Sequence, residues 1–131
     1  MNRSSEWLLL AVVSNEILLN GFSAVRLRDL AKIDKPAPYG RFVESALRSR
    51  KQKLSRAPSI DLRDTASLLT TASAAFPLLT IHREIAEPDI AHVGTIRSAS
   101  PDQIVLKEID PNAKWERTLG RYATDEITRI D

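Results

Sequence analysis

The sequence predicts a mainly β protein with two helices. Near both ends of the chain, apolar residues alternate with polar ones or form short runs between turn-forming residues, which is typical of strands. Between these two blocks, stretches bordered by prolines place apolar residues at helical spacing instead. We therefore expect an N-terminal group of strands, two helices and a C-terminal group of strands.

The composition is that of a soluble globular protein of single-domain size. The chain has 131 residues, of which 43% are hydrophobic and 27% charged, and such a chain buries roughly two-thirds of its unfolded surface. It contains no cysteine, which excludes disulfides and cysteine nucleophiles and is typical of a reducing cytoplasm. The apolar run Trp7–Val13 is too short to span a membrane and no cleavage pattern follows it. We expect a soluble, unprocessed, cytoplasmic protein with no membrane partner.

The N-terminal block predicts a β-meander. An Asn-Gly pair at 20–21 lies between apolar runs, where it is a strong signal for a hairpin turn. Alternation in the stretch that follows predicts that Val25 and Leu27 face the core while Arg26 and Arg28 face water. The expected strands are Trp7–Val13, Ile17–Leu19, Phe22–Arg28 and Leu30–Ile33.

Two helices are predicted between the strand blocks. Pro36 and Pro38 end the first block, because proline cannot donate a ladder hydrogen bond, and they suit a helix start. The first helix covers about Tyr39–Lys51, and the second runs from an Asp61 cap to about Ala75, after a linker at 55–59. The residues expected on the buried faces are Tyr39, Val43, Ala46 and Leu47 in the first helix and Leu62, Ala66, Leu69, Ala72 and Phe76 in the second.

The C-terminal block predicts five further strands. Turn signals at 87–89, 100–102 and 110–113 separate apolar runs. Gly94 falls inside the second of these strands, where a missing side chain permits the sharp bend that a small barrel requires. The expected strands lie within residues 78–84, 90–98, 103–109, 116–123 and 126–130.

A short segment occurs twice in related form. "DLAKID" at 29–34 and "EITRID" at 126–131 share the order acid, aliphatic, small, basic, Ile, Asp. Upstream, "SNEILL" at 14–19 and "SPDQIVL" at 100–106 both read as a turn that leads into an aliphatic strand. We interpret the two blocks as related meanders, of which the first lacks an opening strand. The alternative is coincidence, because short strands of this composition are common.

The stretch from Asp61 to Asp131 resembles an Sm-like domain. It shares the leading helix, the bent five-stranded antiparallel sheet, the glycine in the second strand and a short final strand after a tight turn. The resemblance implies a C-terminal Sm-like small bent β-barrel preceded by a helix, with a shorter related N-terminal β-meander. The whole chain also resembles small uncharacterised bacterial proteins that share the stretches "GFSAVRLRDLAKI", "FPLLTIHRE", "HVGTIRS", "LKEIDPNAKW" and "DEITRID". The expected divisions are 1–35 for the meander, 36–60 for a helix and basic linker, and 61–131 for the Sm-like domain.

The Sm-like resemblance implies rings formed through edge strands and single-stranded RNA bound by two loops. The first loop ordinarily carries Asp and Asn, and here it supplies Asp102 and Gln103. The second ordinarily carries Arg-Gly, and here Asp125 occupies that place. An aspartate repels phosphate where arginine would attract it, so these two loops do not reproduce the family's RNA-binding residues.

Positive charge is concentrated between residues 41 and 56. This segment holds six basic residues against Glu44, a net charge of +5, while the chain totals +2 and the remainder therefore carries −3. Such a segment could bind RNA or an acidic protein; the alternative is a solvated helix end. Nearby Tyr39 and Phe42 have a spacing that suits packing. The candidate nucleic-acid-binding residues are Arg41, Arg48, Arg50, Lys51, Lys53 and Arg56.

Other candidate sites are weaker. His82 and His92 flank a turn, so they could face each other and bind a metal, although solvent-facing histidines explain them more simply. No phosphate loop, nucleophile elbow or zinc-protease helix is present, and we expect no metal, no cofactor and no catalytic site. Trp7 is expected in the core, whereas Trp115 either anchors a partner or folds over its own loop.

Together these features predict a non-enzymatic, Sm-like protein that self-associates through sheet edges and binds RNA or another polyanion. The alternative is a protein-binding scaffold with no nucleic-acid role. An enzyme is the third option, and its sign would be a deep pocket that gathers acidic residues around His82 or His92.

Overall fold

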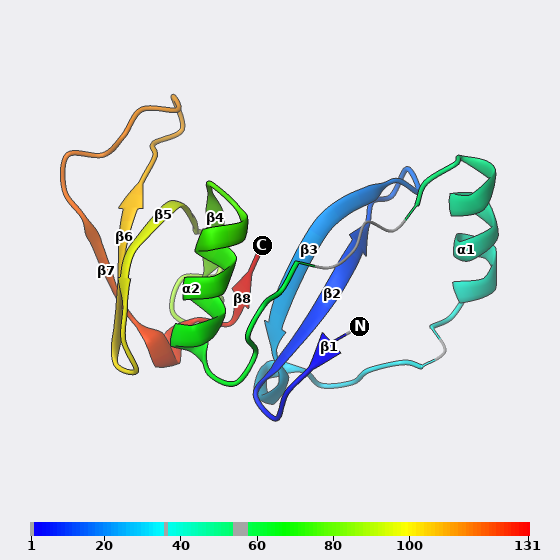
Figure 1. Ribbon diagram of the computed structural model, residues 1–131, viewed down its shortest axis with the longest axis horizontal. Helices are drawn as coiled ribbons and strands as arrows, with labels where there is room; N and C mark the ends of the chain where they lie inside the picture. The colour runs from blue at the N-terminus through cyan, green and yellow to red at the C-terminus, as the bar shows by residue number, and fades with distance from the viewer. Residues whose placement is uncertain (1, 36, 54–57) are drawn as a thin grey trace.

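The computed structural model describes residues 2–35, 37–53 and 58–131 and confirms a mainly β protein with two helices. The strands form one antiparallel sheet of eight, in the order β1-β2-β3-β8-β4-β5-β6-β7, which is not closed within the described residues. Figure 1 shows α2 over the C-terminal part of the sheet and α1 at the opposite end of the molecule. The strands are β1 (Asn2–Arg3), β2 (Trp7–Val13), β3 (Leu19–Arg26), β4 (Leu79–His82), β5 (Ala91–Ala99), β6 (Gln103–Glu108), β7 (Gly120–Ala123) and β8 (Arg129–Ile130), and the helices are α1 (Gly40–Ser49), α2 (Thr65–Ala75) and the 3-10 turns η1 (Leu27–Asp29) and η2 (Thr124–Glu126).

The β2–β3 connection differs from the prediction. The turn lies at residues 14–18, where the Ser14 amide donates to Leu18 O and the Ile17 amide donates to Ser14 O, both at 2.9 Å. The predicted strand Ile17–Leu19 is therefore wrong, and Ile17 has a positive φ of 58°. The Asn-Gly pair lies inside β3 at a bulge, with Gly21 at φ +79°. A positive φ serves a bulge as well as a hairpin turn, which is why the hairpin prediction failed.

The predicted orientation of the β3 arginines is also wrong for Arg26. Arg26 pairs with Trp7 and Ala24 pairs with Leu9 across the β2–β3 ladder, and all four residues are buried. Val25 lies on the other face, and β3 ends at Arg26 rather than at Arg28. The charged end of Arg26 thus lies inside the protein, where it needs hydrogen-bond partners.

Both helices form where expected, but α2 begins later. Its N-cap is Asp64, whose carboxylate accepts the Ser67 amide at 2.8 Å. Asp61, the predicted cap, instead forms an ion pair with Arg63 at 2.7 Å. An aspartate caps a helix only when it immediately precedes the first turn, and Asp64 occupies that position.

The five C-terminal strands are confirmed. In the sheet they lie in the order β8-β4-β5-β6-β7. Along the chain, α2 directly precedes β4. Gly94 pairs with both Leu79 and Glu108, and a Cβ on it would lie 2.1 Å from Lys107 O. Only glycine therefore permits this close approach of β5 and β6.

Strand β8 joins the two halves of the sheet. On one side Ile130 pairs with Ala24 of β3, and on the other it pairs with Ile81 of β4. The hydrophobic core is continuous across this junction and combines residues of the N-terminal meander, α2 and the C-terminal strands. Its members are Trp7, Leu9, Ala24, Leu62, Leu68, Leu69, Ala72, Leu79, Ile81, Ile104, Leu106, Ile127 and Ile130.

The two repeat segments, residues 29–34 and 126–131, agree in part of their structure. Each begins on the last residue of a 3-10 turn, η1 or η2, which follows a strand. The second segment then forms β8, whereas residues 30–34 form no strand and are exposed, so the predicted strand Leu30–Ile33 is wrong. The upstream match is also incomplete, because 100–102 leads into β6 and β7 intervenes before η2.

Candidate nucleic-acid interface

The predicted basic residues lie on α1 and the turn that follows it. Arg41 and Arg48 belong to α1, Arg50 is its C-cap, and Lys51 and Lys53 follow. All five are exposed. Arg56, the sixth candidate, lies outside the described residues. In the described structure the basic segment therefore consists of α1 and the exposed turn that follows it.

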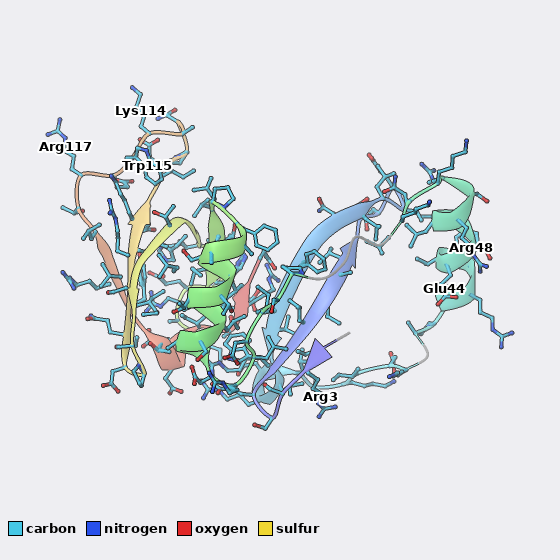
Figure 2. All side chains as sticks on the ribbon, viewed as in Figure 1. Arg3, Glu44, Arg48, Lys114, Trp115 and Arg117 are labelled. Atoms are coloured by element: carbon cyan, nitrogen blue, oxygen red, sulfur yellow. The ribbon has the colours of Figure 1, made fainter. Side chains whose placement is uncertain are left out.

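No described partner neutralises this surface. In the ranges 2–35, 37–53 and 58–131, none of the five basic residues forms an ion pair. Arg48 Nε contacts the backbone oxygen of Glu44 at 3.5 Å, and the cations near the C-terminus of α1 also interact favourably with its dipole. The surface stays positive and accessible, and Figure 2 shows Glu44 and Arg48 on α1, at the opposite end of the molecule from Lys114 and Arg117.

The two aromatic residues beside the basic segment are exposed, which contradicts the prediction that they pack. Tyr39 is 84% exposed and Phe42 is 64% exposed. Tyr39 is the N-cap of α1 in a left-handed conformation, with φ 61°, so its side chain leaves the helix face that Val43 and Leu47 share. Helical spacing identifies a common face but not whether another element covers it.

The turn after helix α1 hydrogen-bonds to the start of β3. The Leu19 amide donates to Gln52 Oε1 at 3.2 Å. Leu47 is half-buried and, with Leu19 and Gln52, lines a shallow surface hollow. The start of α1 is thereby left open to solvent, with Tyr39 and Phe42 on it.

The two loops that the Sm-like resemblance assigns to RNA lie against each other. The Thr124 amide donates to Asp102 O at 3.0 Å, and Thr124 Oγ1 donates to Ser100 O at 3.0 Å. Asp125 forms an ion pair with Arg28 at 2.8 Å, and this hydrogen-bonded guanidinium lowers the pKa of the Asp125 carboxyl. The second loop therefore contacts the N-terminal meander.

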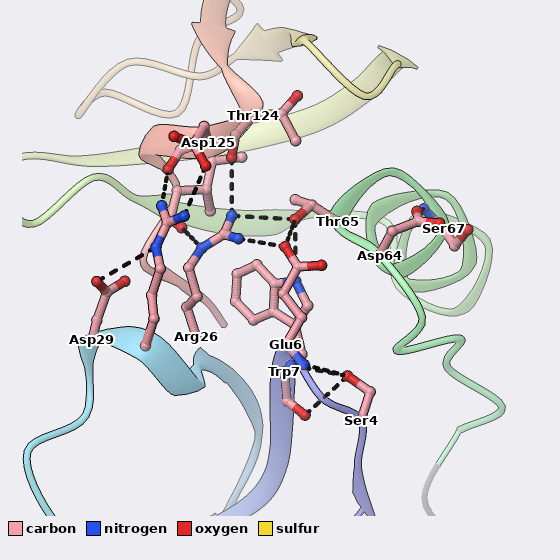
Figure 3. Close-up of polar contacts among 12 residues, drawn as sticks. Ser4, Glu6, Trp7, Arg26, Asp29, Asp64, Thr65, Ser67, Thr124 and Asp125 are labelled. Carbon is pink, nitrogen blue, oxygen red and sulfur yellow. Dashed lines mark hydrogen bonds and ion pairs between the residues drawn. The ribbon is translucent and has the colours of Figure 1, made fainter.

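Arg26 forms the centre of a buried network at the same junction (Figure 3). Its guanidinium donates to Ile127 O at 2.7 Å, to Thr124 O at 3.0 Å and to Glu6 Oε1 at 2.5 Å. It also lies 4.5 Å from the ring centroid of Trp7. Burial lowers the pKa of Arg26, and Glu6 opposes that shift. A fourth hydrogen bond runs to Thr65 Oγ1 at 3.2 Å, so four of the five N–H groups of the guanidinium have acceptors and the network fixes the meander against η2.

A hollow of about 440 Å³ adjoins this network. Its charged lining consists of Glu6, Asp64 and Asp125, against Arg26 as the single cation among the lining residues. Because Arg26 is already hydrogen-bonded to protein acceptors, the hollow presents mainly acidic groups. Such a lining does not favour phosphate.

The structure corrects both interpretations of the histidines. His82 pairs with Ala91, and His92 pairs with Ile81, so the two imidazoles lie on opposite faces of the sheet and cannot bind one metal. Their side chains are only 13% and 12% exposed, so neither faces solvent. His82 Nε2 lies 2.8 Å from Asp131 Oδ2.

His92 belongs to a polar cluster that the sequence did not indicate. Its Nδ1 lies 2.6 Å from Glu108 Oε1, and its Nε2 lies 2.8 Å from Glu87 Oε2. Tyr122 donates its hydroxyl to Glu108 Oε2 at 2.5 Å, and burial, together with this bond, raises the Tyr122 pKa well above its usual value. Arg83 closes the cluster through Glu87 at 2.6 Å. Every member has a partner, which describes a structural network better than a reactive site.

The register of β5, β6 and β7 assembles this cluster. Gly94 pairs with Glu108, and Ile104 pairs with Tyr122, so residues far apart in sequence reach one face of the sheet. Gly120 leaves room for the cluster, since a Cβ there would lie 2.2 Å from Glu108 Oε2. Within the described residues, no group of three or more potential ligands could hold a metal ion.

The two tryptophans differ as expected. Trp7 is fully buried, which confirms its place in the core, and its Nε1 donates to Thr65 Oγ1 at 3.1 Å. Trp115 is 50% exposed, and Lys107 Nζ lies 5.1 Å from its ring centroid. Trp115 is therefore only partly covered by its own surroundings.

Comparisons with protein-family models, curated proteins and solved structures found no match to this chain. Neither helix in the described parts of the chain has the length and apolar composition needed to cross a membrane.

Proposed function

We propose that this chain is a non-enzymatic Sm-like protein that binds single-stranded RNA through α1 and the turn after it. The observation that carries this proposal is the group of five exposed cations that have no ion pair among the described residues, next to exposed Tyr39 and Phe42. Single-stranded RNA presents phosphates and unstacked bases together, and basic residues beside aromatic rings match both.

Several features of the C-terminal part support the Sm-like assignment. Helix α2 precedes five antiparallel strands, Gly94 lies in the second of them, and the 3-10 turn η2 leads into the short final strand β8. The two loops that usually bind RNA in this family are not the proposed site, because Asp125 is paired with Arg28 and the adjacent hollow is acidic. The proposed interface therefore lies outside the Sm-like part.

The proposal predicts strongly salt-dependent binding. Each phosphate contact releases condensed counterions, and a single strand loses about 0.7 of a log unit in affinity per contact for each log unit of salt. Five contacts would give a slope of about −3.5. An interaction dominated by Tyr39 and Phe42 would respond much less to salt, because stacking releases few ions.

Fluorescence anisotropy of a labelled oligouridylate tests the proposal. We expect binding at low salt that weakens strongly when Arg48, Arg50, Lys51 and Lys53 are all changed to Gln. The control removes the same number of charges elsewhere, through Arg3→Gln, Lys32→Gln, Lys35→Gln and Arg63→Gln, and should retain binding. No binding by the unmodified protein at low salt, or equal loss in both variants, would contradict the proposal. Binding of polyglutamate in place of RNA would favour the protein-binding scaffold.

We also propose self-association through the edge of β7. At one end of the C-terminal strands, β8 is covered by β3, so a ring made through β8 would require the N-terminal meander to leave. At the other end, β7 pairs with β6 and with no other described strand. An open strand edge can pair with a second copy. Light scattering should show a dimer or larger species at high protein concentration, and a monomer would overturn this part.

A further inference from the structure

A second group of cations lies at the end of the molecule opposite α1. We call it the Trp115 surface, and it consists of Lys107, Lys114, Trp115, Arg117 and Arg121. None of its four cations forms an ion pair with a described residue. Figure 2 shows Lys114 and Arg117 pointing outward from the β6–β7 connection, far from Arg48 on α1.

Strand register brings two of these cations to one face of the sheet. Arg121 pairs with Val105 across β6 and β7, and Lys107 lies two residues farther along β6. Both side chains therefore project to the same face, as diagonal neighbours. The other face carries Ile104 and Leu106, which are fully buried in the core. The cations thus lie on the outer face of a rigid sheet.

A defined turn positions Trp115 on this outer face. Asp110 accepts the amides of Asn112 and Lys114 through Oδ1, at 2.8 and 2.9 Å, which fixes the β6–β7 connection. Trp115 then returns to form a bridge with Ile109. One side of the indole meets Lys107, and half of the side chain's surface stays open to solvent.

We propose that the Trp115 surface is a second binding site for single-stranded RNA, in which the indole stacks on a base while Lys107 and Arg121 contact phosphates. This inference takes its ligand class from the proposed function but concerns a different surface. The acidic groups nearby are limited: Asp110 is engaged in its turn, Glu108 lies in the inner cluster, and Glu116 is exposed.

The chemistry of this surface favours RNA over an acidic protein. Acidic peptides need only cations, whereas an open indole between cations matches a ligand that alternates planar bases with phosphates. The cation–π contact with Lys107 also favours one orientation of the indole. A ring that already prefers one orientation loses less entropy when a base stacks on it.

Tryptophan fluorescence tests the inference directly, since Trp7 and Trp115 are the two tryptophans in the chain and Trp7 is fully buried. We expect unlabelled oligouridylate to quench the emission of the unmodified protein to saturation, and to leave that of a Trp115→Phe variant unchanged. An abasic oligonucleotide of equal length, or polyglutamate, should quench little. Equal quenching by the abasic oligonucleotide would overturn the stacking role.

Anisotropy of the labelled oligouridylate separates this inference from the proposed function. Trp115→Ala should weaken binding roughly tenfold, because stacking on one aromatic ring contributes about 1–3 kcal/mol, and Lys107→Gln with Arg121→Gln should weaken it several-fold. Thr118→Ala in the same connection is the matched control and should change nothing. RNA binding without any change in Trp115 emission would overturn this inference and leave α1 as the site. Quenching that survives neutralisation of α1 would support this surface even if the α1 site fails.

Discussion

The two repeat segments, 29–34 and 126–131, have related sequences but different secondary structure. Both 3-10 turns have an extended N-cap, Arg26 with φ −76° and ψ 123° and Ala123 with φ −64° and ψ 125°, and both C-caps are extended as well. After the turns the segments diverge. Residues 129–130 form β8, which pairs on both sides, whereas 30–34 pair with no strand.

This difference shows that neighbouring strands decide whether the segment becomes a strand. At 126–131 the edges of β3 and β4 supply hydrogen-bond partners on two sides. At 30–34 the chain departs toward α1, and the segment's own contact is the ion pair of Lys32 with Asp34 at 2.9 Å. Strand propensity measures fit to a pleated surface rather than an intrinsic preference. The repeated sequence therefore specifies the turn more firmly than the strand.

The largest expected effect is at the residue that precedes each turn. Arg26 is buried and contacts two backbone carbonyls, a carboxylate and the Trp7 ring, whereas Ala123 is exposed. Arg26→Ala should lower the free energy of unfolding by about 4 kcal/mol, because it leaves Glu6 and two carbonyls without their donor. Ala123→Arg should change it by less than about 0.5 kcal/mol. Urea unfolding followed by circular dichroism measures both, and similar costs would contradict the comparison.

The next effect concerns the isoleucine that the two segments share. Ile130 is 4% exposed and Ile33 is 44% exposed. Ile130→Ala should lower the free energy of unfolding by about 3 kcal/mol, since it leaves a cavity between β3 and β4. The matched change Ile33→Ala should cost less than about 0.5 kcal/mol. A large loss from Ile33→Ala in thermal unfolding would show that 30–34 is packed in solution.

A smaller effect is expected at Gly120, the first residue of β7. Gly120→Ala should cost about 2 kcal/mol, because the new methyl would press on Glu108 and Tyr122. It should also bring the raised pKa of Tyr122 back toward 10.0. In the unmodified protein, the contribution of Tyr122 is present below pH 10 and is lost as the pH rises through its folded pKa. Ultraviolet titration of tyrosine detects the shift, and an unchanged curve would refute the steric argument.

The smallest effect is at Arg28 and Asp125. Each of these residues directly precedes one of the two repeat segments, and the two form an ion pair with each other. Arg28→Gln should raise the lowered pKa of Asp125, as measured by carbon-13 NMR titration of its carboxyl. The stability from this pair is present above the ordinary carboxyl pKa of 3.8 and is lost as the pH falls through the folded value. Exchanging the two charges, Arg28→Asp with Asp125→Arg, should restore the contact, and a swap no better than either single change would argue against it.

Local pattern was sufficient for much of the fold. The five C-terminal strands and the run Trp7–Val13 follow from alternation and turn residues, because those signals act within a few residues of each strand. The glycine inside a strand predicts a bend at Gly94, and in the structure Gly94 permits the close approach of β5 and β6. The Asn-Gly pair did not mark the turn of the N-terminal hairpin, since Asn-Gly serves a bulge as readily as a turn.

The buried arginine and the histidine cluster could not be predicted from local pattern. The alternation with Val25 and Leu27 predicts that Arg26 faces water, whereas its acceptors at Thr124 and Ile127 lie at the other end of the sequence. The partners of His92 likewise depend on the register of β5 with β6. For α1, the spacing identified an amphipathic helix, but nothing in the sequence indicates that Tyr39 and Phe42 are left uncovered.

The place of β8 between β3 and β4 has a consequence for synthesis on the ribosome. Residues of β3 and β4 are synthesised well before residues 129–130. The edges of β3 and β4 that pair with β8 therefore have no partner until this two-residue strand has been made. The sheet must then be completed from its middle, by the pairing of greatest sequence separation, which slows folding. A nascent chain stalled before residue 129 would expose two unpaired strand edges at once.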